Sequence, residues 1–170
     1  MTRILVSACL LGAPVRYDGG HLGGSSDVLA AWQRAGRLVP FCPEVAAGFP
    51  TPRPAAEIRG GGGGAQVLAR GARVVEESGR DVSAQFIAGA EQALALAQRN
   101  GVRLAILAEG SPSCGSTAIY DGSFGGRLIE GSGVTAALLE SAGIRVFSQH
   151  RLAEAAAWLD ELEAAERGPG

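Results

Sequence analysis

The chain has 170 residues, 46% of them hydrophobic, which is enough to bury the core of one domain. A net charge of −2 and a pI of about 5.7 exclude a strongly basic surface of the kind that attracts nucleic acid or anionic membranes. The three cysteines are an odd number, which argues against a disulfide framework and favours the reducing cytoplasm. We therefore expect a cytoplasmic protein with a small-molecule partner, although Arg16, Arg53 and Arg59 leave a local anion-binding patch as an alternative.

The first apolar segment, residues 3–8 (RILVSA), is rich in β-forming residues and predicts a buried strand. Its uninterrupted apolar part is too short for an export signal, and no segment of the chain is long enough to span a bilayer. Residues 27–36 predict a helix with Val28, Leu29 and Trp32 on one face. Residues 37–41 (RLVPF) predict a second strand, which Pro40 places at a sheet edge or a strand end.

Five glycines at 60–64 precede a segment of mixed character. They lack the lysine and the preceding strand of a phosphate-binding loop, so we interpret them as a flexible tether. Residues 65–81 then predict a hairpin or a solvated insertion.

The second half of the chain alternates helices and strands. Helices are expected at 81–101, 135–143 and 152–167, strands at 102–108 and 144–148, and a frayed tail at 165–170. Asp81 is expected to cap the first of these helices, and Gly101 to end it. This alternation predicts one α/β domain over 1–170, with a mostly parallel, Rossmann-like sheet flanked by helices.

Each cysteine follows a predicted strand. Cys9 follows the strand at 3–8, Cys42 follows the strand at 37–41, and Cys114 lies in the loop after the strand at 102–108. A single free cysteine is usually a small core residue. Because parallel strands end at one edge of their sheet, where α/β proteins bind ligands, we expect these three to form one site.

Three thiolates with one open coordination position suit a catalytic metal. The candidates are zinc with a bound water, or a [4Fe–4S] cluster with one iron that has no protein ligand. Thiolate ligands favour the cluster. A structural zinc site would need a fourth ligand. The only histidines are His21, in a glycine-rich loop, and His150, at the start of the last helix.

Five blocks of sequence together resemble the 2-thiouracil desulfidase family. They are SACLLGAPVRYDG, FCPEVAAGFPTPRPAAEI, GRDVSAQFIAGAEQAL, SPSCGSTAIYDGSF and GSGVTAALLESAGIRVFS, in the family order over about residues 4–148. The resemblance implies a [4Fe–4S] cluster held by Cys9, Cys42 and Cys114, and removal of sulfur from a thiolated pyrimidine without net redox chemistry. One departure is Ala108, where the family often has a lysine, so a charge near the site is missing here.

Catalysis of this kind needs a base that activates water. Glu44, two residues after Cys42, is the first candidate, and its structural alternative is a helix-terminal carboxylate. Ser111 is a candidate for orienting water or donating to the ring, or a simple turn serine. Asp18 is a weaker candidate because Asp-Gly is a common turn. Tyr17 or Tyr120 would either stack on the pyrimidine or belong to the core.

Two rival functions are open from the sequence. One is a three-cysteine zinc hydrolase of the nucleobase deaminase type, although the closely spaced cysteine pair of that class is absent. The other is a non-enzymatic iron-sulfur sensor or sulfur carrier. The acidic balance favours a free thiolated base or nucleoside over a nucleic acid, with thiolated tRNA as the alternative substrate.

Overall fold

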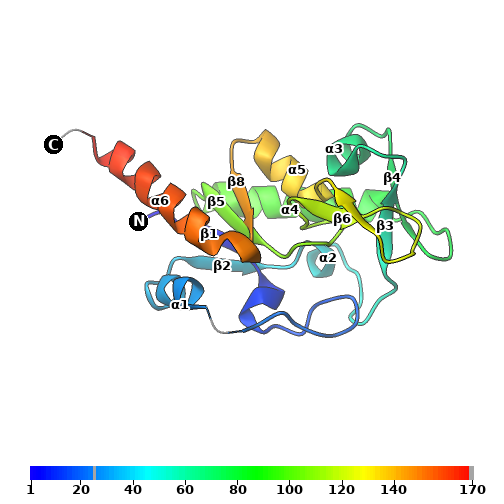
Figure 1. Ribbon diagram of the computed structural model, residues 1–170, viewed down its shortest axis with the longest axis horizontal. Helices are drawn as coiled ribbons and strands as arrows, with labels where there is room; N and C mark the ends of the chain where they lie inside the picture. Colours follow the sequence, from blue (N-terminus) through cyan, green and yellow to red (C-terminus); the bar gives the residue numbers. More distant parts are fainter. Residues whose placement is uncertain (25, 169–170) are drawn as a thin grey trace.

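The centre of the protein is a four-stranded parallel sheet (Figure 1). The structure is a computed structural model that describes residues 1–24 and 26–168. The strands, in the order β2-β1-β5-β8, are β1 (Ile4–Ser7), β2 (Leu38–Phe41), β5 (Leu104–Leu107) and β8 (Arg145–Ser148). Val6 pairs with Pro40 on one side and Ile106 on the other. Pro40 therefore lies in the edge strand β2, as its missing N–H group requires.

Helices cover both faces of this sheet and confirm the α/β prediction. They are α1 (Asp27–Arg34), α4 (Ser83–Arg99), α5 (Val134–Ser141) and α6 (Leu152–Arg167). Ile4 and Val6 pack with α1 and α6, whereas Leu5 packs with α4 and α5. Successive strand residues point to opposite faces, so a strand buried on both sides is apolar throughout. None of the helices in the described chain is both long and apolar enough to cross a membrane.

The expected helix ends are largely present. Asp81 was expected to cap α4, but Val82 holds the N-cap position. The Asp81 carboxylate, one residue earlier, still accepts a hydrogen bond from the N–H of Ser83, the first helical residue, at 2.9 Å. Gly36 and Gly101 adopt φ values of 70° and 63° just beyond α1 and α4. Part of the expected tail was wrong: residues 165–167 belong to α6. Residues 169–170 of that tail lie outside the described residues.

The segment interpreted as a tether and a hairpin or insertion folds differently. β4 (Arg73–Glu76) pairs antiparallel with β3 (Ala56–Arg59), which precedes the glycines, and α3 (Gly63–Leu68) lies between them. The prediction of a flexible tether was wrong. Gly64 N donates to the Ser132 carbonyl at 2.7 Å, and a Cβ on Gly64 would lie 2.2 Å from the Gly133 oxygen. These glycines let α3 approach the start of α5 closely.

Several short elements complete the fold. They are η1 (Ala8–Leu11), α2 (Pro43–Ala46), β6 (Ala118–Tyr120), β7 (Leu128–Glu130) and η2 (Gln149–Arg151). The antiparallel pair β3–β4 and α3 share a separate core with one end of α4, through Ile58, Val74 and Phe86. In Figure 1 this unit lies at the end of the molecule opposite the C-terminus of α6. The chain thus has two adjoining cores, and the site lies between them.

Candidate active site

A cavity of about 440 Å³ opens where the parallel strands end and faces the antiparallel pair β3–β4. Ser7, Phe41 and Ala108 line it from the ends or just beyond the ends of β1, β2 and β5. Glu57 and Glu76 line it from β3 and β4. This position, at the carboxyl edge of a parallel sheet, is where α/β proteins build ligand sites.

The three cysteines all line this cavity, each from a different loop. Cys9 lies in η1, directly after β1, and its carbonyl accepts from Leu22 N at 2.8 Å. Cys42 precedes α2 and is half-buried, whereas Cys9 and Cys114 are buried. The expectation that three strand ends bring the thiols to one place therefore matches their positions in the structure.

Burial and the neighbouring thiols set the protonation of the cysteines. Burial, and then the neighbouring Cys42, raise the pKa of Cys9 to about 11, while Arg16 opposes the rise. Burial also raises the pKa of Cys114 far above its ordinary value, against a lowering contact with the Ser7 hydroxyl. Both thiols are therefore protonated at neutral pH, and a metal cation among them would favour their thiolate forms.

The loop that carries Cys114 is fixed by hydrogen bonds before and after the thiol. Ser111 Oγ accepts from the N–H groups of Ser113 and Cys114, at 3.0 and 3.2 Å. The Glu109 carboxylate accepts from the N–H groups of Ser116, Thr117 and Ala118 and from two hydroxyls, which are those of Ser116 and Thr117. Partial burial raises the pKa of Glu109, but these hydrogen bonds outweigh it, so the pKa lies below its usual value.

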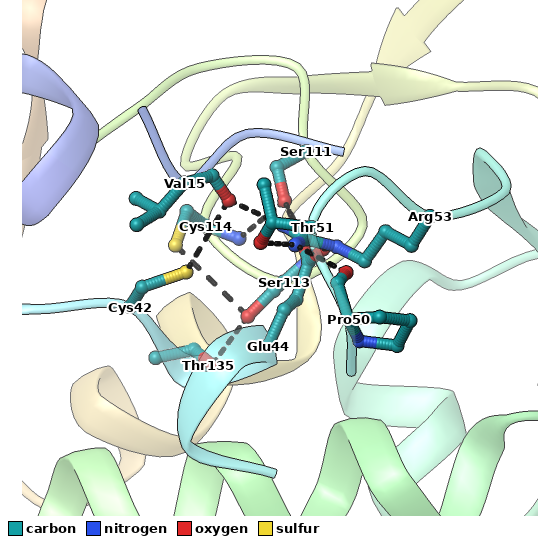
Figure 2. Close-up of polar contacts among 10 residues, drawn as sticks. All are labelled: Val15, Cys42, Glu44, Pro50, Thr51, Arg53, Ser111, Ser113, Cys114 and Thr135. Atoms are coloured by element: carbon teal, nitrogen blue, oxygen red, sulfur yellow. Dashed lines mark hydrogen bonds and ion pairs between the residues drawn. The ribbon is translucent and has the colours of Figure 1, made fainter. Parts of the chain in front are cut away.

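Glu44 lies in the first turn of α2 and has a partner for each carboxylate oxygen (Figure 2). Arg53 Nε donates to Glu44 Oε2 at 2.7 Å, and the Ser111 hydroxyl donates to Glu44 Oε1 at 3.3 Å. Glu44 is thus a helix-start carboxylate, as its structural alternative describes, and it also lines the cavity beside Ser111. The Ser111 oxygen accepts the two hydrogen bonds of its turn, and the Ser111 proton is donated to Glu44.

Arg53 is the residue whose role sequence reasoning missed. The sequence indicated it only as a member of an arginine patch, but its side chain is 4% exposed and ion-paired to Glu44. Its Nη2 donates to the Val15 carbonyl at 2.8 Å, and its Nη1 donates to Thr51 Oγ1 at 3.1 Å. The Val15 carbonyl also lies 4.0 Å from the Cys42 sulfur. Arg53 therefore links Glu44 to the loop beside a cysteine, a long-range pairing for which the sequence gives no local signal.

The structure does not bring Asp18 to this group. Asp18 is exposed, and its carboxylate accepts a hydrogen bond from Gly20 N at 2.8 Å. This contact belongs to an Asp-Gly turn, the structural alternative for Asp18 in the sequence analysis. His21 and His150 are exposed too, and neither is among the residues that line the cavity.

Of the tyrosines and arginines considered in the sequence analysis, some line the cavity and some do not. Tyr17 and Tyr120 line the cavity and are partly exposed, so neither belongs to the core. Arg16 also lines the cavity. Arg59 instead donates to the Gly122 carbonyl at 2.8 Å, so the three arginines do not form one patch.

The donor set was compared with the two metal centres that the sequence left open. Among the described residues, no three His, Cys, Asp or Glu side chains converge closely enough to hold a single metal ion, which argues against the three-cysteine zinc site. Three thiols from separate loops around one cavity suit a larger group whose several iron atoms each take one thiolate. The residues present therefore fit a [4Fe–4S] cluster better than one zinc ion.

Comparisons with known proteins agree with this geometry. The chain is similar to the [4Fe–4S]-dependent thiouracil desulfidase TudS, whose solved structure superposes with a TM-score of 0.85 at 52% identity, covering 94% of this chain and 99% of that one. It is also 47% identical over 149 residues to the uncharacterized protein YbbK of Bacillus subtilis (strain 168), covering 88% of this chain and 97% of YbbK. The family model described as 2-thiouracil desulfurase matches residues 4–151. The chain belongs to the 2-thiouracil desulfurase family.

Proposed function

We propose that this chain catalyses the iron-sulfur-dependent, non-redox desulfuration of a thiolated pyrimidine to its oxo form, with release of sulfide. The substrate is 2-thiouracil or a related base or nucleoside. The observation that carries the proposal is that three thiols from three strand ends line the same cavity as Glu44 and Ser111. Family membership and the likeness to a [4Fe–4S]-dependent thiouracil desulfidase support it.

Cys9, Cys42 and Cys114 are the residues that would hold the cluster, leaving one iron without a protein ligand. When bound, the cluster supplies a soft Lewis acid that polarises the thiocarbonyl group of the substrate. A sensor or sulfur carrier would need only the three thiols. Glu44 and Ser111 beside them give this cavity the groups that a hydrolytic step requires.

The reaction exchanges one atom for another without moving electrons between centres. Water supplies the oxygen that replaces sulfur on the ring carbon, and its two protons balance the departing sulfide. In this proposal Glu44 accepts a proton from that water. Because Arg53 binds Oε2, the other carboxylate oxygen, Oε1, which faces Ser111, is the atom that we assign to accept the proton of the water. The Ser111 hydroxyl donates its proton to Oε1 and so orients the carboxylate that activates the water.

The proposed setting is a single domain in the cytoplasm. All three cysteines are free thiols, as a reducing compartment would keep them. The proposed substrate is a free base or nucleoside, and thiolated tRNA is the alternative. The two are separated by comparing sulfide release from 2-thiouracil with release from thiolated tRNA under the same conditions.

Anaerobically prepared protein tests the proposal directly. We expect about four irons and four sulfides per chain, broad absorption near 400 nm, and conversion of 2-thiouracil to uracil with one sulfide released per turnover. Serine at Cys9, Cys42 or Cys114 should remove most of the iron. Full iron retention in all three variants would overturn the ligand assignment, whereas iron without uracil formation would indicate a sensor or carrier.

Glu44→Gln tests the base. It keeps the size of the side chain but accepts no proton at neutral pH, so turnover should fall by about 10²–10⁴ while iron content stays unchanged. Asp18→Asn is the matched control, because this carboxylate lies in an exposed turn. Near-normal turnover of Glu44→Gln would remove Glu44 from the mechanism and leave Ser111 as the next residue to test.

A further inference from the structure

The loop 121–127, which joins β6 to β7, contributes Phe124 to the wall of the cavity. Phe124 has a φ of 59°, in the left-handed region that bulky residues rarely adopt. Glycines stand at 122, 125 and 126 of the same loop, so the sequence uses glycine freely nearby but places an aromatic residue at this strained position. Such strain persists where the surrounding structure enforces it, and it is common at ligand-binding sites.

Two residues of β3 enforce the conformation of this loop. Glu57 is 8% exposed, and its Oε1 accepts hydrogen bonds from the N–H groups of Gly122 and Phe124, at 3.0 and 3.1 Å. Arg59 Nε donates to the Gly122 carbonyl at 2.8 Å. The guanidinium carbon of Arg59 also lies 5.6 Å from the centroid of the Phe124 ring. The ring is therefore held in place from its backbone and from one of its sides.

The other phenylalanines of the cavity already pack in or against the cores, and Phe41, at the end of β2, packs against the core that contains Leu5. The rings of Phe49 and Phe86 lie 5.3 Å apart, tilted by 59°, and belong to the core of the β3–β4 unit. Tyr17 and Tyr120 are 43% and 39% exposed, and Tyr120 is free of the left-handed strain. Phe124 alone among the six Phe and Tyr residues that line the cavity combines a half-buried ring, a strained backbone and a buried carboxylate that holds it.

We infer that Phe124 is a specificity-determining residue that stacks on the planar ring of the substrate, and that Glu57 is its positioning residue. The inference rests on the proposed function. Stacking on an aromatic ring tolerates different bases because each presents a π face, so it selects flat thiolated heterocycles rather than one pattern of hydrogen bonds. A small thiocarbonyl compound without a ring, such as thiourea, would gain nothing from Phe124.

The test compares Phe124→Leu and Phe124→Tyr in the cluster-loaded protein. Leucine keeps an apolar side chain but has no π face, so the KM for 2-thiouracil should rise about tenfold while kcat changes by less than about threefold. Tyrosine should behave like the natural residue, and the KM for thiourea should be the same in all three proteins. Leu128→Ala is the control, because Leu128 is an exposed residue of the following strand that does not line the cavity.

A second measurement does not depend on turnover. Equilibrium dialysis of uracil against cluster-free protein should give a Kd about tenfold weaker for Phe124→Leu than for the natural chain. Glu57→Ala should raise the KM for 2-thiouracil as Phe124→Leu does, and the double variant should be no worse than Phe124→Leu alone. Glu57→Gln keeps an acceptor oxygen and should restore much of the loss.

The outcomes separate this inference from the function on which it rests. Normal turnover in the natural protein with an unchanged KM in Phe124→Leu would overturn the stacking role. An equal rise in KM for 2-thiouracil and thiourea would overturn it too, because the damage would then be general. If the natural, cluster-loaded protein releases no sulfide from 2-thiouracil, the proposed function fails first and the inference fails with it.

Discussion

Arg53→Met should lower the free energy of unfolding by about 3–5 kcal/mol, the usual effect of removing one partner of a buried ion pair. Methionine keeps much of the length of the side chain but donates no hydrogen bonds. It leaves the Glu44 carboxylate without its partner at 2.7 Å and the Val15 carbonyl without its donor at 2.8 Å. The side chains of Arg53 and Glu44 are only 4% and 15% exposed, so water compensates little for the loss.

The assay is urea unfolding of the cluster-free protein, with thermal melting as a second reading. For a chain of this size, each kcal/mol shifts Tm by roughly 2–4 °C, so we expect a fall of about 10 °C. A double-mutant cycle tests whether the loss of stability depends on the contact between Arg53 and Glu44. Glu44→Gln removes the charge that Arg53 neutralises, so the double variant should be more stable than the two separate losses predict, by about 1–3 kcal/mol.

Turnover supplies an independent reading of the same pair. Arg53→Met should lower turnover in the cluster-loaded protein, because Glu44 loses the contact that fixes one of its oxygens. In the Glu44→Gln background the same change should have little further effect. Losses that add to within about 0.5 kcal/mol in stability, together with multiplicative losses in turnover, would refute the view that Arg53 acts through Glu44.

Two further predictions follow from the pKa shifts. Burial and the neighbouring Cys42 raise the pKa of Cys9 to about 11, so in cluster-free protein at pH 8 iodoacetamide should modify Cys9 more slowly than half-buried Cys42, and faster as the pH approaches 11. Timed mass spectrometry measures both rates, and equal rates at pH 8 would contradict the prediction. Glu109 has a folded-state pKa below its usual 4.5, so its stabilising effect is present above that value and is lost as the pH falls through the lowered pKa. Glu109→Gln should therefore be less stable than the natural chain at pH 7, and the difference should shrink below about pH 4.5; a constant difference down to pH 2 would be the contrary result.

The parallel sheet was predictable because its strands are buried on both faces. The segments 3–8 and 102–108 each contain an apolar run without alternation, which is typical of such strands. Cys9 directly follows the first segment, and Cys114 lies in the loop after the second. Since parallel strands end at one edge, the gathering of the three thiols followed from the order of the elements alone. The position of Glu44 and Ser111 in the cavity could be predicted for the same reason, because each stands within three residues of a cysteine.

The parts that sequence reasoning missed depend on contacts between distant segments. The five glycines at 60–64 disfavour a helix because glycine has a low helix propensity, and the helix-forming residues that follow, Ala65–Leu68, are too few to predict one alone. The short helix α3 packs against α5. The strand β3 pairs across the glycines with β4, a register that no short turn signal specifies. Arg53 and Phe124 have roles set by partners that only the folded chain brings near, namely Glu44 and Glu57.

The close approach of α3 to α5 extends to the cysteine loop. Gly133 N donates to the Gly115 carbonyl at 2.7 Å, and a Cβ on Gly133 would lie 2.5 Å from the Ser113 oxygen, next to Cys114. A methyl group on Gly64 would meet Gly133 from the other side. Glycine-rich stretches usually tolerate mutation, but here Gly64 and Gly133 act as spacers between α3 and a thiol. A substitution of Gly64 in α3 should therefore displace the loop that carries Cys114 and lower the iron content of the protein. The range of residues that α3 accepts is then limited by cofactor assembly.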